Sequence, residues 1–378
     1  MTGKQISQKT GLVDSQVWVG AELRPGMPQA VLEAIRSKIL SVGDRSVPSW
    51  RQAQLRSTFS VYPALVSSVA FSPDGQTLVC GYSTWGRQPN SIKMWHLPTQ
   101  KLLNGCFNQV GSTSAIAIGA IARNPSTAQN GQNAGATETF PVLVNSSAED
   151  GALKVWNLET KTLLHTLKGH AAGVKTVAIA AHRQLLASGS YDNSVKLWNL
   201  STGTLQQTFL GHKDTVSGVA FDPQAHVLAS SSYDQTIKLW AIQTGEVIRT
   251  LVGHTKQVTS LAFSPDGAVL ASTSEDATIR LWNLVKGEAS LTLSGHVGGV
   301  LAIAFSPDGQ TLASGGTDGK VRLWCPVTGQ LIRTLGSGWS QWLPSHSKSV
   351  STLSFSPDGT SLASGHMDGT VKLWCCDR

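Results

Sequence analysis

Apolar and polar residues alternate in short blocks along most of this chain. A representative block is Val-Ser-Gly-Val-Ala-Phe at 216–221, and Val-Leu-Ala-Ser-Ser-Ser follows at 227–232 after a polar turn. Blocks of about six residues bounded by Gly, Pro, Asp and Ser are typical of β-strands rather than helices. Ser-Pro-Asp-Gly, which suits a tight hairpin turn, occurs at 72–75, 264–267, 306–309 and 356–359. The pattern predicts an all-β protein built from hairpins.

The blocks recur at a constant interval in the central part of the chain. Lys-Leu-Trp or Arg-Leu-Trp ends at Trp198, Trp240, Trp282 and Trp324, which are spaced by 42 residues. A Gly-His pair opens each unit, at 169–170, 211–212, 253–254 and 295–296, and an Asp lies six residues before each tryptophan. A repeat of this length is one supersecondary unit, so neighbouring copies are expected to bury a continuous core between them.

These units resemble the WD40 repeat, which is about 40–45 residues long with Gly-His near its start and Trp near its end. Three weaker units extend the series, so that third-strand tryptophans occur at 95, 156, 198, 240, 282, 324 and 374. The resemblance implies a seven-bladed WD40 β-propeller with four strands in each blade. The near-identical consecutive units are more similar to the regular WD40 arrays of prokaryotes than to diverged eukaryotic subunits.

The resemblance also predicts the domain division. Residues 55–378 are expected to form the propeller, and residues 1–54 an N-terminal extension. The chain ends four residues after Trp374, so the last blade lacks a fourth strand, and Leu-Arg-Ser-Thr-Phe at 55–59 matches the fourth-strand pattern. As in WD40 proteins generally, a strand at 55–60 is expected to complete the last blade and close the ring, because an open ring leaves unpaired sheet edges.

The extension contains one segment with helical periodicity. Val31, Leu32, Ile35 and Ile39 are spaced as on one face of a helix, and Gly43 follows as a stop signal. The segment from 29 to 40 therefore predicts a short amphipathic helix of about three turns. Two interpretations stay open. The helix docks on the rim of the propeller, anchored by the flanking tryptophans at 18 and 50, or it binds a partner protein.

Each regular unit contains Ser, His and Asp, the residue types of a hydrolase triad. A catalytic centre occurs once in a fold, whereas this set recurs in five units. The resemblance implies a structural hydrogen-bond tetrad instead, running from Trp to Ser to His to Asp. The expected tetrads are His170, Ser188, Asp192 and Trp198; His212, Ser230, Asp234 and Trp240; His254, Ser272, Asp276 and Trp282; His296, Ser314, Asp318 and Trp324; and His346, Ser364, Asp368 and Trp374.

The first two blades depart from this tetrad. In blade 2 the sequence aligns Ser114 with the histidine, while Ser146 and Asp150 hold the serine and aspartate positions. In blade 1 the histidine, serine and aspartate are replaced by Tyr62, Cys80 and Pro89. We expect these two blades to be less rigid than the others.

Composition narrows the possible functions. No nucleophile elbow, phosphate-binding Gly-rich loop or zinc-spaced Cys/His cluster occurs, so we expect no catalytic residue, no cofactor and no metal site.

The five cysteines form no C-x-x-C pair, which favours reduced thiols and a cytoplasmic protein. No signal peptide or membrane-spanning run is recognisable. The net charge is +7, and residues 1–57 contribute +4 of it, so the propeller itself is nearly neutral.

Protein contacts are expected on the top face, where the loops from fourth to first strand and from second to third strand meet. The position before each Asp is a recurrent contact site in the family, and two insertions add tryptophans to the same face. The predicted contacts are Trp85, Arg87, Tyr191, Tyr233, Glu275, Trp339, Trp342 and Met367. Aromatic residues and Met are enriched at interfaces. The alternative interpretation is that the tryptophans only cap the imperfect blade 1.

A basic residue also precedes every third-strand Trp by two positions, at 93, 154, 196, 238, 280, 322 and 372. We interpret it as a solvated or inter-blade position paired with carboxylates rather than as a phosphate-binding ring. The sequence as a whole favours a non-enzymatic scaffold or assembly subunit that binds one or more proteins or peptides. The alternatives are a nucleic-acid- or membrane-surface-associated subunit that uses the basic N-terminal segment, and an unrecognised enzyme.

Overall fold

The computed structural model describes residues 49–60, 64–83, 91–103, 107, 111–122, 139–147, 149–284, 286–336 and 348–377. The predicted helix at 29–40 lies outside these residues, as does Trp18. The one helical segment that lies wholly within the described residues is a short 3-10 turn, η3 (Ala181–Arg183). None of the helices in this part of the chain is long and apolar enough to cross a membrane.

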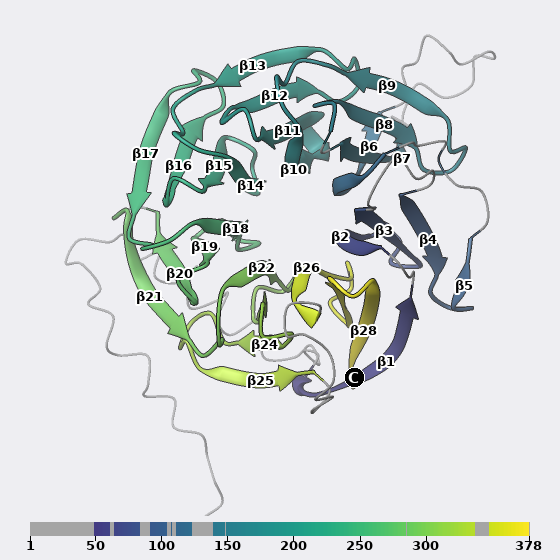
Figure 1. The fold of residues 1–378 in the computed structure, drawn as a ribbon, viewed down its shortest axis with the longest axis vertical. Coiled ribbons are helices and arrows are strands. Elements are labelled where there is room, and N and C mark those ends of the chain that lie inside the picture. Colours follow the sequence, from purple (N-terminus) through teal and green to yellow (C-terminus); the bar gives the residue numbers. More distant parts are fainter. Residues whose placement is uncertain are drawn as a thin grey trace, which may run out of the picture. The chain divides into compact units, whose positions relative to one another are not determined.

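The described strands form seven four-stranded antiparallel sheets around a central opening, which confirms the predicted all-β, seven-bladed propeller (Figure 1). Each sheet is one blade, and its strands run in order from the centre outward. Blades 1 to 3 consist of β2 (Leu65–Phe71), β3 (Thr77–Ser83), β4 (Ile92–His96) and β5 (Lys101–Leu102); β6 (Thr113–Ala122), β7 (Thr139–Ser147), β8 (Leu153–Asn157) and β9 (Leu163–Leu167); and β10 (Val174–Ala180), β11 (Leu185–Ser190), β12 (Val195–Asn199) and β13 (Leu205–Phe209).

The remaining blades repeat the same order. Blades 4 to 6 consist of β14 (Val216–Phe221), β15 (Val227–Ser232), β16 (Thr236–Ala241) and β17 (Val247–Val252); β18 (Val258–Phe263), β19 (Val269–Ser274), β20 (Thr278–Asn283) and β21 (Glu288–Ser294); and β22 (Val300–Phe305), β23 (Leu312–Gly316), β24 (Val321–Trp324) and β25 (Leu331–Leu335). Blade 7 consists of β26 (Val350–Phe355), β27 (Ser361–His366), β28 (Thr370–Asp377) and β1 (Ser49–Ser60).

Strand β1 is the outer strand of blade 7, so the first and last described strands lie side by side (Figure 1). In its antiparallel register with β28, Leu55 pairs with Trp374 and Phe59 with Val371. The strand begins at Ser49, before the expected 55–60, so the domain boundary expected at 54/55 lies inside it. Trp50 is buried against the edge of Phe355, with ring centroids 5.3 Å apart, and therefore belongs to the core of blade 7.

The core lies between neighbouring blades. Each third-strand tryptophan packs against the preceding blade, as Trp240 does against Phe209 of β13 at 5.4 Å between ring centroids. One cluster joins Val195 and Leu197 of blade 3 with Leu228 and Trp240 of blade 4, and similar clusters link the other blades. Burial of one such large apolar side chain contributes roughly 1.5–3 kcal/mol. A blade is therefore stabilised mainly by its neighbours.

Candidate partner-binding face

The tetrad of blade 3 is a continuous chain of hydrogen bonds. Trp198 Nε1 donates to Ser188 Oγ at 2.9 Å, and the Ser188 hydroxyl donates to His170 Nε2 at 2.8 Å. His170 Nδ1 then donates to Asp192 Oδ2 at 2.9 Å. This direction assigns the proton of a neutral imidazole to Nδ1. The chain ties the loop that carries His170 to the second and third strands of the same blade.

Blades 4, 5 and 6 contain the same arrangement with distances of 2.7–3.0 Å. The four serines, Ser188, Ser230, Ser272 and Ser314, are 0% exposed. A nucleophile must reach its substrate, and these hydroxyls are enclosed between the indole and the imidazole. The geometry therefore supports a structural role for these four sets.

The electrostatics agree with a neutral histidine beside an ionised aspartate. Burial raises the pKa of the Asp192 carboxyl, but the hydrogen bonds it accepts from Ser194 and Ala171 outweigh burial and bring the pKa to about 2. Asp276 also has a pKa of about 2, for the same kind of reason. Burial lowers the pKa of His170 and His254 more than their aspartates raise it.

Blade 7 has a different histidine in its chain. Trp374 Nε1 donates to Ser364 Oγ at 2.9 Å, but the serine contacts His366 Nε2 at 3.0 Å. His366 Nδ1 donates to the Lys348 carbonyl at 3.2 Å. The expected His346 lies outside the described residues. Among the described residues Asp368 accepts bonds from the Thr370 N–H and hydroxyl within its own turn. Because its expected partner His346 lies outside these residues, the assignment of Asp368 to the tetrad stays a prediction.

The register of blade 2 corrects two of our alignments. Trp156 Nε1 donates to Asn145 Oδ1 at 2.7 Å, so Asn145 and not Ser146 occupies the tetrad position. Asn145 pairs with Lys154 in blade 2 as Ser188 pairs with Lys196 in blade 3. The turn between β7 and β8 is therefore one residue longer than the corresponding turn of blade 3, and this shifts the register. Ser114 lies in the inner strand β6 and lines the central channel, and therefore does not hold the histidine position.

In blade 1 the thiol of Cys80 takes the tetrad position, since Cys80 pairs with Lys93 as Ser188 pairs with Lys196. Two residues later Tyr82 holds the place that His366 has in blade 7, and its ring lies 6.5 Å from that of Trp95. Burial raises the pKa of both the Cys80 thiol and the Tyr82 phenol, so both are neutral. Tyr62 and Pro89 lie outside the described residues.

The basic residues before the tryptophans make mainly local contacts. Lys196 donates to Thr208 Oγ1 at 2.9 Å and Lys238 to Thr250 Oγ1 at 3.1 Å, each across to the outer strand of its own blade. Arg322 forms an ion pair with Asp318 at 2.7 Å. The expected pairing with carboxylates therefore holds for Arg322, whereas the two lysines bond threonine hydroxyls.

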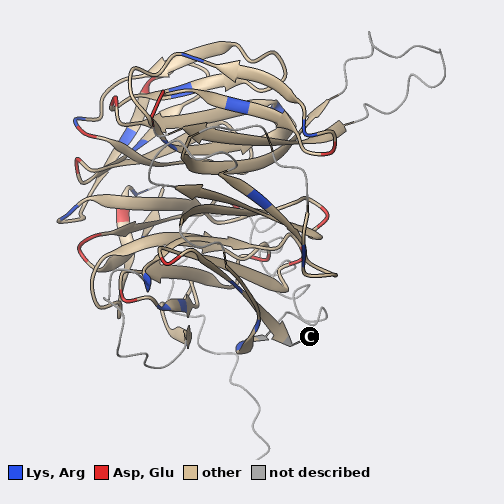
Figure 2. Ribbon diagram, turned by 45° about the vertical axis from the view of Figure 1, so that its right-hand side comes forward, with Lys and Arg blue, Asp and Glu red and all other residues tan. Residues whose placement is uncertain are grey.

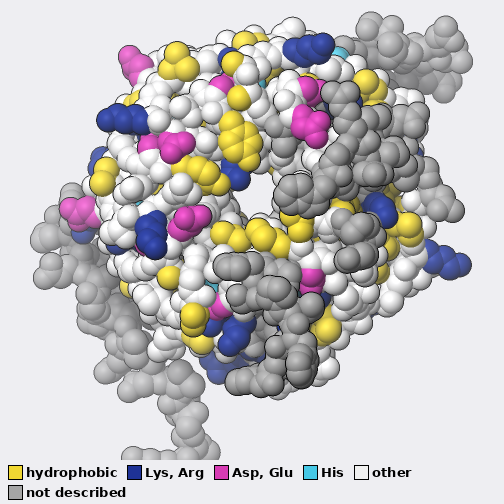
Figure 3. Space-filling view, viewed as in Figure 1, with side chains coloured by type: hydrophobic (Ala, Val, Ile, Leu, Met, Phe, Trp, Pro, Cys, Tyr) yellow, Lys and Arg dark blue, Asp and Glu magenta, His cyan; other side chains and the backbone are white. Residues whose placement is uncertain are grey.

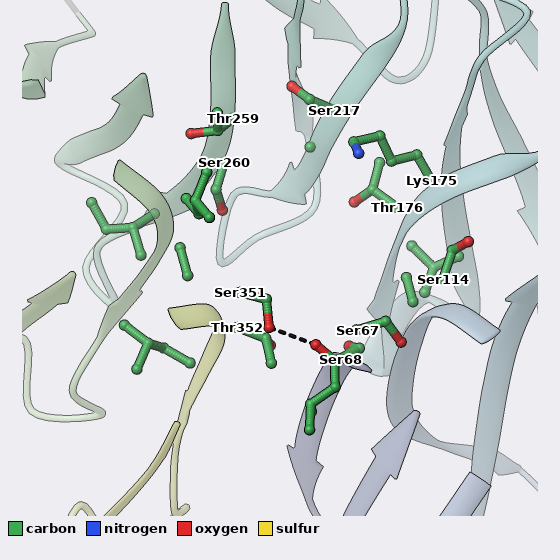
Figure 4. A pocket seen from close by; sticks show the side chains of 18 of the residues that line it. Ser67, Ser68, Ser114, Lys175, Thr176, Ser217, Thr259, Ser260, Ser351 and Thr352 are labelled. Carbon is green, nitrogen blue, oxygen red and sulfur yellow. Dashed lines mark hydrogen bonds between the residues drawn. The ribbon is translucent and has the colours of Figure 1, made fainter. Parts of the chain in front are cut away.

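The inner strands enclose a central channel of about 660 Å³. At one level of the channel each blade contributes one residue of its inner strand. This residue lies two positions before the one that pairs with the tetrad serine, or with the residue that replaces this serine. We call this set the channel ring: Ser67, Ser114, Lys175, Ser217, Thr259, Leu301 and Ser351. Figure 4 shows six of these positions around the opening with their labels, all but Leu301.

Hydroxyl groups of the channel ring connect neighbouring blades. Ser217 Oγ donates to the Val258 carbonyl, and Thr259 Oγ1 to the Val300 carbonyl, both at 2.5 Å. Ser67 and Ser351 make the equivalent bonds to the Thr113 and Val66 carbonyls. Each bond joins an inner strand to the next one around the ring. Lys175 and Leu301 have no hydroxyl to make it.

Lys175 lies between two tyrosines that the sequence had placed on the top face. Its Nζ is 5.6 Å from the ring centre of Tyr191 and 5.3 Å from that of Tyr233, within the range of a cation–π contact. Tyr191 belongs to the β11–β12 turn of blade 3 and Tyr233 to the β15–β16 turn of blade 4. Sequence reasoning missed Lys175. The signal was available, because the position is a hydroxyl residue in five of the seven units.

The structure brings four predicted contacts to one place. Tyr191, Tyr233, Glu275 and Met367 all line the mouth of the channel. Tyr191 is 45% exposed and Glu275 is also exposed. Hydrophobic side chains gather around the opening on the face seen in Figure 3. The other predicted contacts, Trp85, Arg87, Trp339 and Trp342, lie outside the described residues.

The comparisons with known proteins agree with this fold. The family described as "WD domain, G-beta repeat" matches residues 53–96, 161–199 and 339–375, and the family described as "WDR90, 4th beta-propeller" matches residues 215–341. No curated protein matches the chain. With seven four-stranded blades, these matches define the class: the chain belongs to the WD40-repeat β-propellers. The described residues contain no group of three or more His, Cys, Asp or Glu placed to hold a metal ion.

Proposed function

We propose that this protein is a non-enzymatic scaffold that binds a partner protein or peptide at the mouth of its central channel. WD40 propellers commonly mediate protein–protein interaction, and the proposal adds the place. In this proposal the propeller, whose outer strand β1 begins at Ser49, is the binding domain, and the part of the predicted extension that precedes this strand is separate from it. Trp85, Arg87, Trp339 and Trp342 are proposed to widen the same face at blades 7 and 1.

One observation carries the proposal. Tyr191 and Tyr233 project from adjacent blades to the same channel mouth, with the Lys175 ammonium between them. Tyrosine offers a large, rigid apolar surface with a polar end, which is why it is enriched where proteins contact each other. A folded blade has no need of an exposed aromatic ring at this turn, because blades 5 to 7 have Glu275, Thr317 and Met367 in its place.

The distribution of charge favours a protein partner over nucleic acid. A nucleic-acid site is expected to concentrate Lys and Arg on one face. In the view of Figure 2, Lys and Arg are interspersed with Asp and Glu over the described strands and turns. Among the described residues that line the channel, Lys175 and Glu275 are the charged ones, and their charges cancel.

The test is an affinity pull-down from native extract followed by mass spectrometry. Wild type is compared with the Tyr191→Ala/Tyr233→Ala variant and with Leu205→Ala, a control that truncates a 44% exposed side chain on the outer strand β13. Circular dichroism first establishes that all three are folded. We expect proteins that are retained by wild type and by the Leu205 variant but lost from the tyrosine variant. Equal retention by all three proteins would place the binding surface elsewhere.

A further inference from the structure

Lys175 stands where the fold itself favours a hydroxyl. Four of the equivalent side chains, Ser67, Ser217, Thr259 and Ser351, bridge to the next inner strand with a hydrogen bond. At Lys175 that bridge is replaced by a cation that is partly withdrawn from water. Burying a charge costs free energy unless a partner compensates for it. Lys175 and Leu301 are the two members of the channel ring without a hydroxyl, and of these Lys175 is the charged one. A residue that gives up a stabilising bond and buries a charge instead is a candidate for function.

The ammonium of Lys175 has aromatic but no anionic neighbours. Among the described residues it forms no ion pair, whereas Asp192, Asp234, Asp276 and Asp318 are all engaged by histidines. The rings of Tyr191 and Tyr233 hold the ammonium by cation–π contacts. Burial lowers the pKa of Lys175, but its interactions with Tyr233 and Tyr191 outweigh burial and raise it, so the lysine is charged. Neither tyrosine supplies an anion. Lys175 lines the channel together with the hydroxyl residues Thr176 and Ser217 (Figure 4).

We propose that Lys175 receives a single carboxylate, the side chain of an Asp or Glu that the partner inserts into the channel mouth between Tyr191 and Tyr233. The ammonium and the carboxylate form a charge-assisted hydrogen bond in a partly enclosed site, and the tyrosine rings cover the apolar stem of the inserted side chain. This inference rests on the proposed function, because it assigns the chemistry of the partner that binds at that mouth.

The number of cations at the channel mouth distinguishes a carboxylate from a phosphate. Lys175 is the one cation and Glu275, on blade 5 next to the blade of Tyr233, the one carboxylate among the described residues that line the channel. The single ammonium neutralises a carboxylate, whereas the second charge of a phosphate has no cationic partner in this lining. The site therefore matches one acidic residue beside neutral or basic ones, rather than a phosphorylated residue or a run of acids.

The test uses short peptide pools that differ only at a fixed central residue: Glu, Gln or phosphoserine. Binding to the full-length protein is measured by fluorescence anisotropy, and the best peptides of each pool are then titrated singly. Lys175→Met keeps the length of the side chain but removes its charge, and Lys175→Arg keeps the charge. Lys213→Met is the matched control, because Lys213 is an exposed lysine in the loop before β14.

We expect wild type to prefer the Glu pool, and Lys175→Met to bind its best peptides at least about tenfold more weakly, as loss of a charge-assisted bond implies. Lys175→Arg restores most of the affinity, Lys213→Met leaves it unchanged, and added salt weakens binding by wild type but not by Lys175→Met. Equal affinity of wild type for the Glu and Gln pools would overturn the inference. So would a preference for phosphoserine that depends on Lys175.

The pull-down separates failure of this inference from failure of the proposed function. If the Tyr191→Ala/Tyr233→Ala variant loses its partners while Lys175→Met keeps them at wild-type levels, the binding face stands and the carboxylate assignment is wrong. If neither variant loses a partner, both proposals are wrong.

Discussion

Blades 3 to 6 build the same Trp-Ser-His-Asp chain four times, whereas blades 7, 1 and 2 surround the equivalent position with three different sets of residues. We call these the regular arc and the variable arc. In the variable arc, Trp374 reaches His366 through Ser364, and Trp156 bonds Asn145 directly. Blade 1 places Cys80 and Tyr82 at the corresponding positions.

The comparison shows which part of the tetrad each blade requires. In blades 2 and 7, as in the regular arc, the buried indole N–H has an acceptor on the second strand, because an unsatisfied buried donor costs roughly 1–3 kcal/mol. The histidine and the aspartate, unlike this acceptor, can be replaced by other residues. In the regular arc they tie the loop before the inner strand to the blade. A blade without them is therefore expected to have a looser loop but to remain folded.

The largest effect is expected where the variable arc closes the ring. Removing Ser49–Ser60 deletes β1, exposes the edge of β28 and removes Trp50 and Phe59 from two core clusters. We expect loss of cooperative folding, measured as loss of the sigmoidal urea transition. Deleting residues 1–20 is the control and is expected to leave the transition in place. A normal transition without β1 would mean that the ring does not depend on its closure.

The next effect compares one aspartate from each arc. Asp234 accepts bonds from His212 Nδ1, from the Lys213 and Thr236 N–H groups and from the Thr236 hydroxyl, whereas the described bonds of Asp368 run to Thr370 alone. Asp234→Asn is expected to lower the free energy of unfolding by about 3 kcal/mol, and Asp368→Asn by about 1 kcal/mol or less. Urea titration of both variants measures the difference. Equal losses would show that the two arcs do not differ in this respect.

Mild acid is expected to act most strongly through His366 of the variable arc, and the lowered pKa values of His170 and His254 in the regular arc add a loss of the same sign. Burial, with a further contribution from Lys372, lowers the pKa of His366 from 6.5 to about 4. The unfolded chain therefore binds a proton that the folded one does not, and stability falls by roughly 2–3 kcal/mol as the pH drops from 6.5 to about 4. The aspartates of the regular arc lower the free energy of unfolding only below about pH 4, because the pKa values of Asp192 and Asp276 in the folded protein are about 2.

The measurement is the free energy of unfolding at several pH values for wild type and His366→Gln. The glutamine keeps a polar side chain but does not titrate. Its stability is expected to be lower at pH 7 yet flatter between pH 6.5 and about 4. Parallel curves for the two proteins would exclude His366 as the source of the acid sensitivity.

The sequence predicted the regular arc almost residue by residue. In the variable arc it predicted the pair of Ser364 with Trp374 and the position of Cys80, but missed other residues for identifiable reasons. A constant period fixes the register, so Ser188 and Trp198 could be paired without a structure. In blade 2 one extra turn residue shifts the register, so that Asn145 replaces the expected Ser146. In blade 7 the sequence analysis missed His366, which contacts Ser364 from two residues further along the same strand, a relation that no repeat period reveals.

The sequence shows only part of what makes Lys175 unusual. Its departure from a series of hydroxyl residues is visible in the aligned units, but its position beside Tyr233 of the next blade exists only once the ring is formed. The sequence analysis placed Tyr191 and Tyr233 on the top face because their positions recur in every unit. It had no way to show that one inner-strand lysine lies between them.

The smallest effect has the opposite sign and tests why Lys175 is present. Lys175→Ser supplies the hydroxyl that Ser217 and Thr259 have, so that it can donate to the Val216 carbonyl of blade 4 as Ser217 donates to the Val258 carbonyl of blade 5. It also removes a partly buried cation. We expect a gain of about 1 kcal/mol in the free energy of unfolding, together with loss of binding to acidic peptides.

Ser217→Ala is the reciprocal control, because it removes an existing bridge and is expected to cost about 1 kcal/mol. Both changes are measured by urea titration at neutral pH on the full-length chain. A stabilised Lys175→Ser protein with weaker peptide binding means that the lysine is kept at the expense of stability, as residues of binding sites often are. A destabilised one means that the contacts of Lys175 with Tyr191 and Tyr233 hold the mouth together, and the lysine then belongs to the fold rather than to recognition.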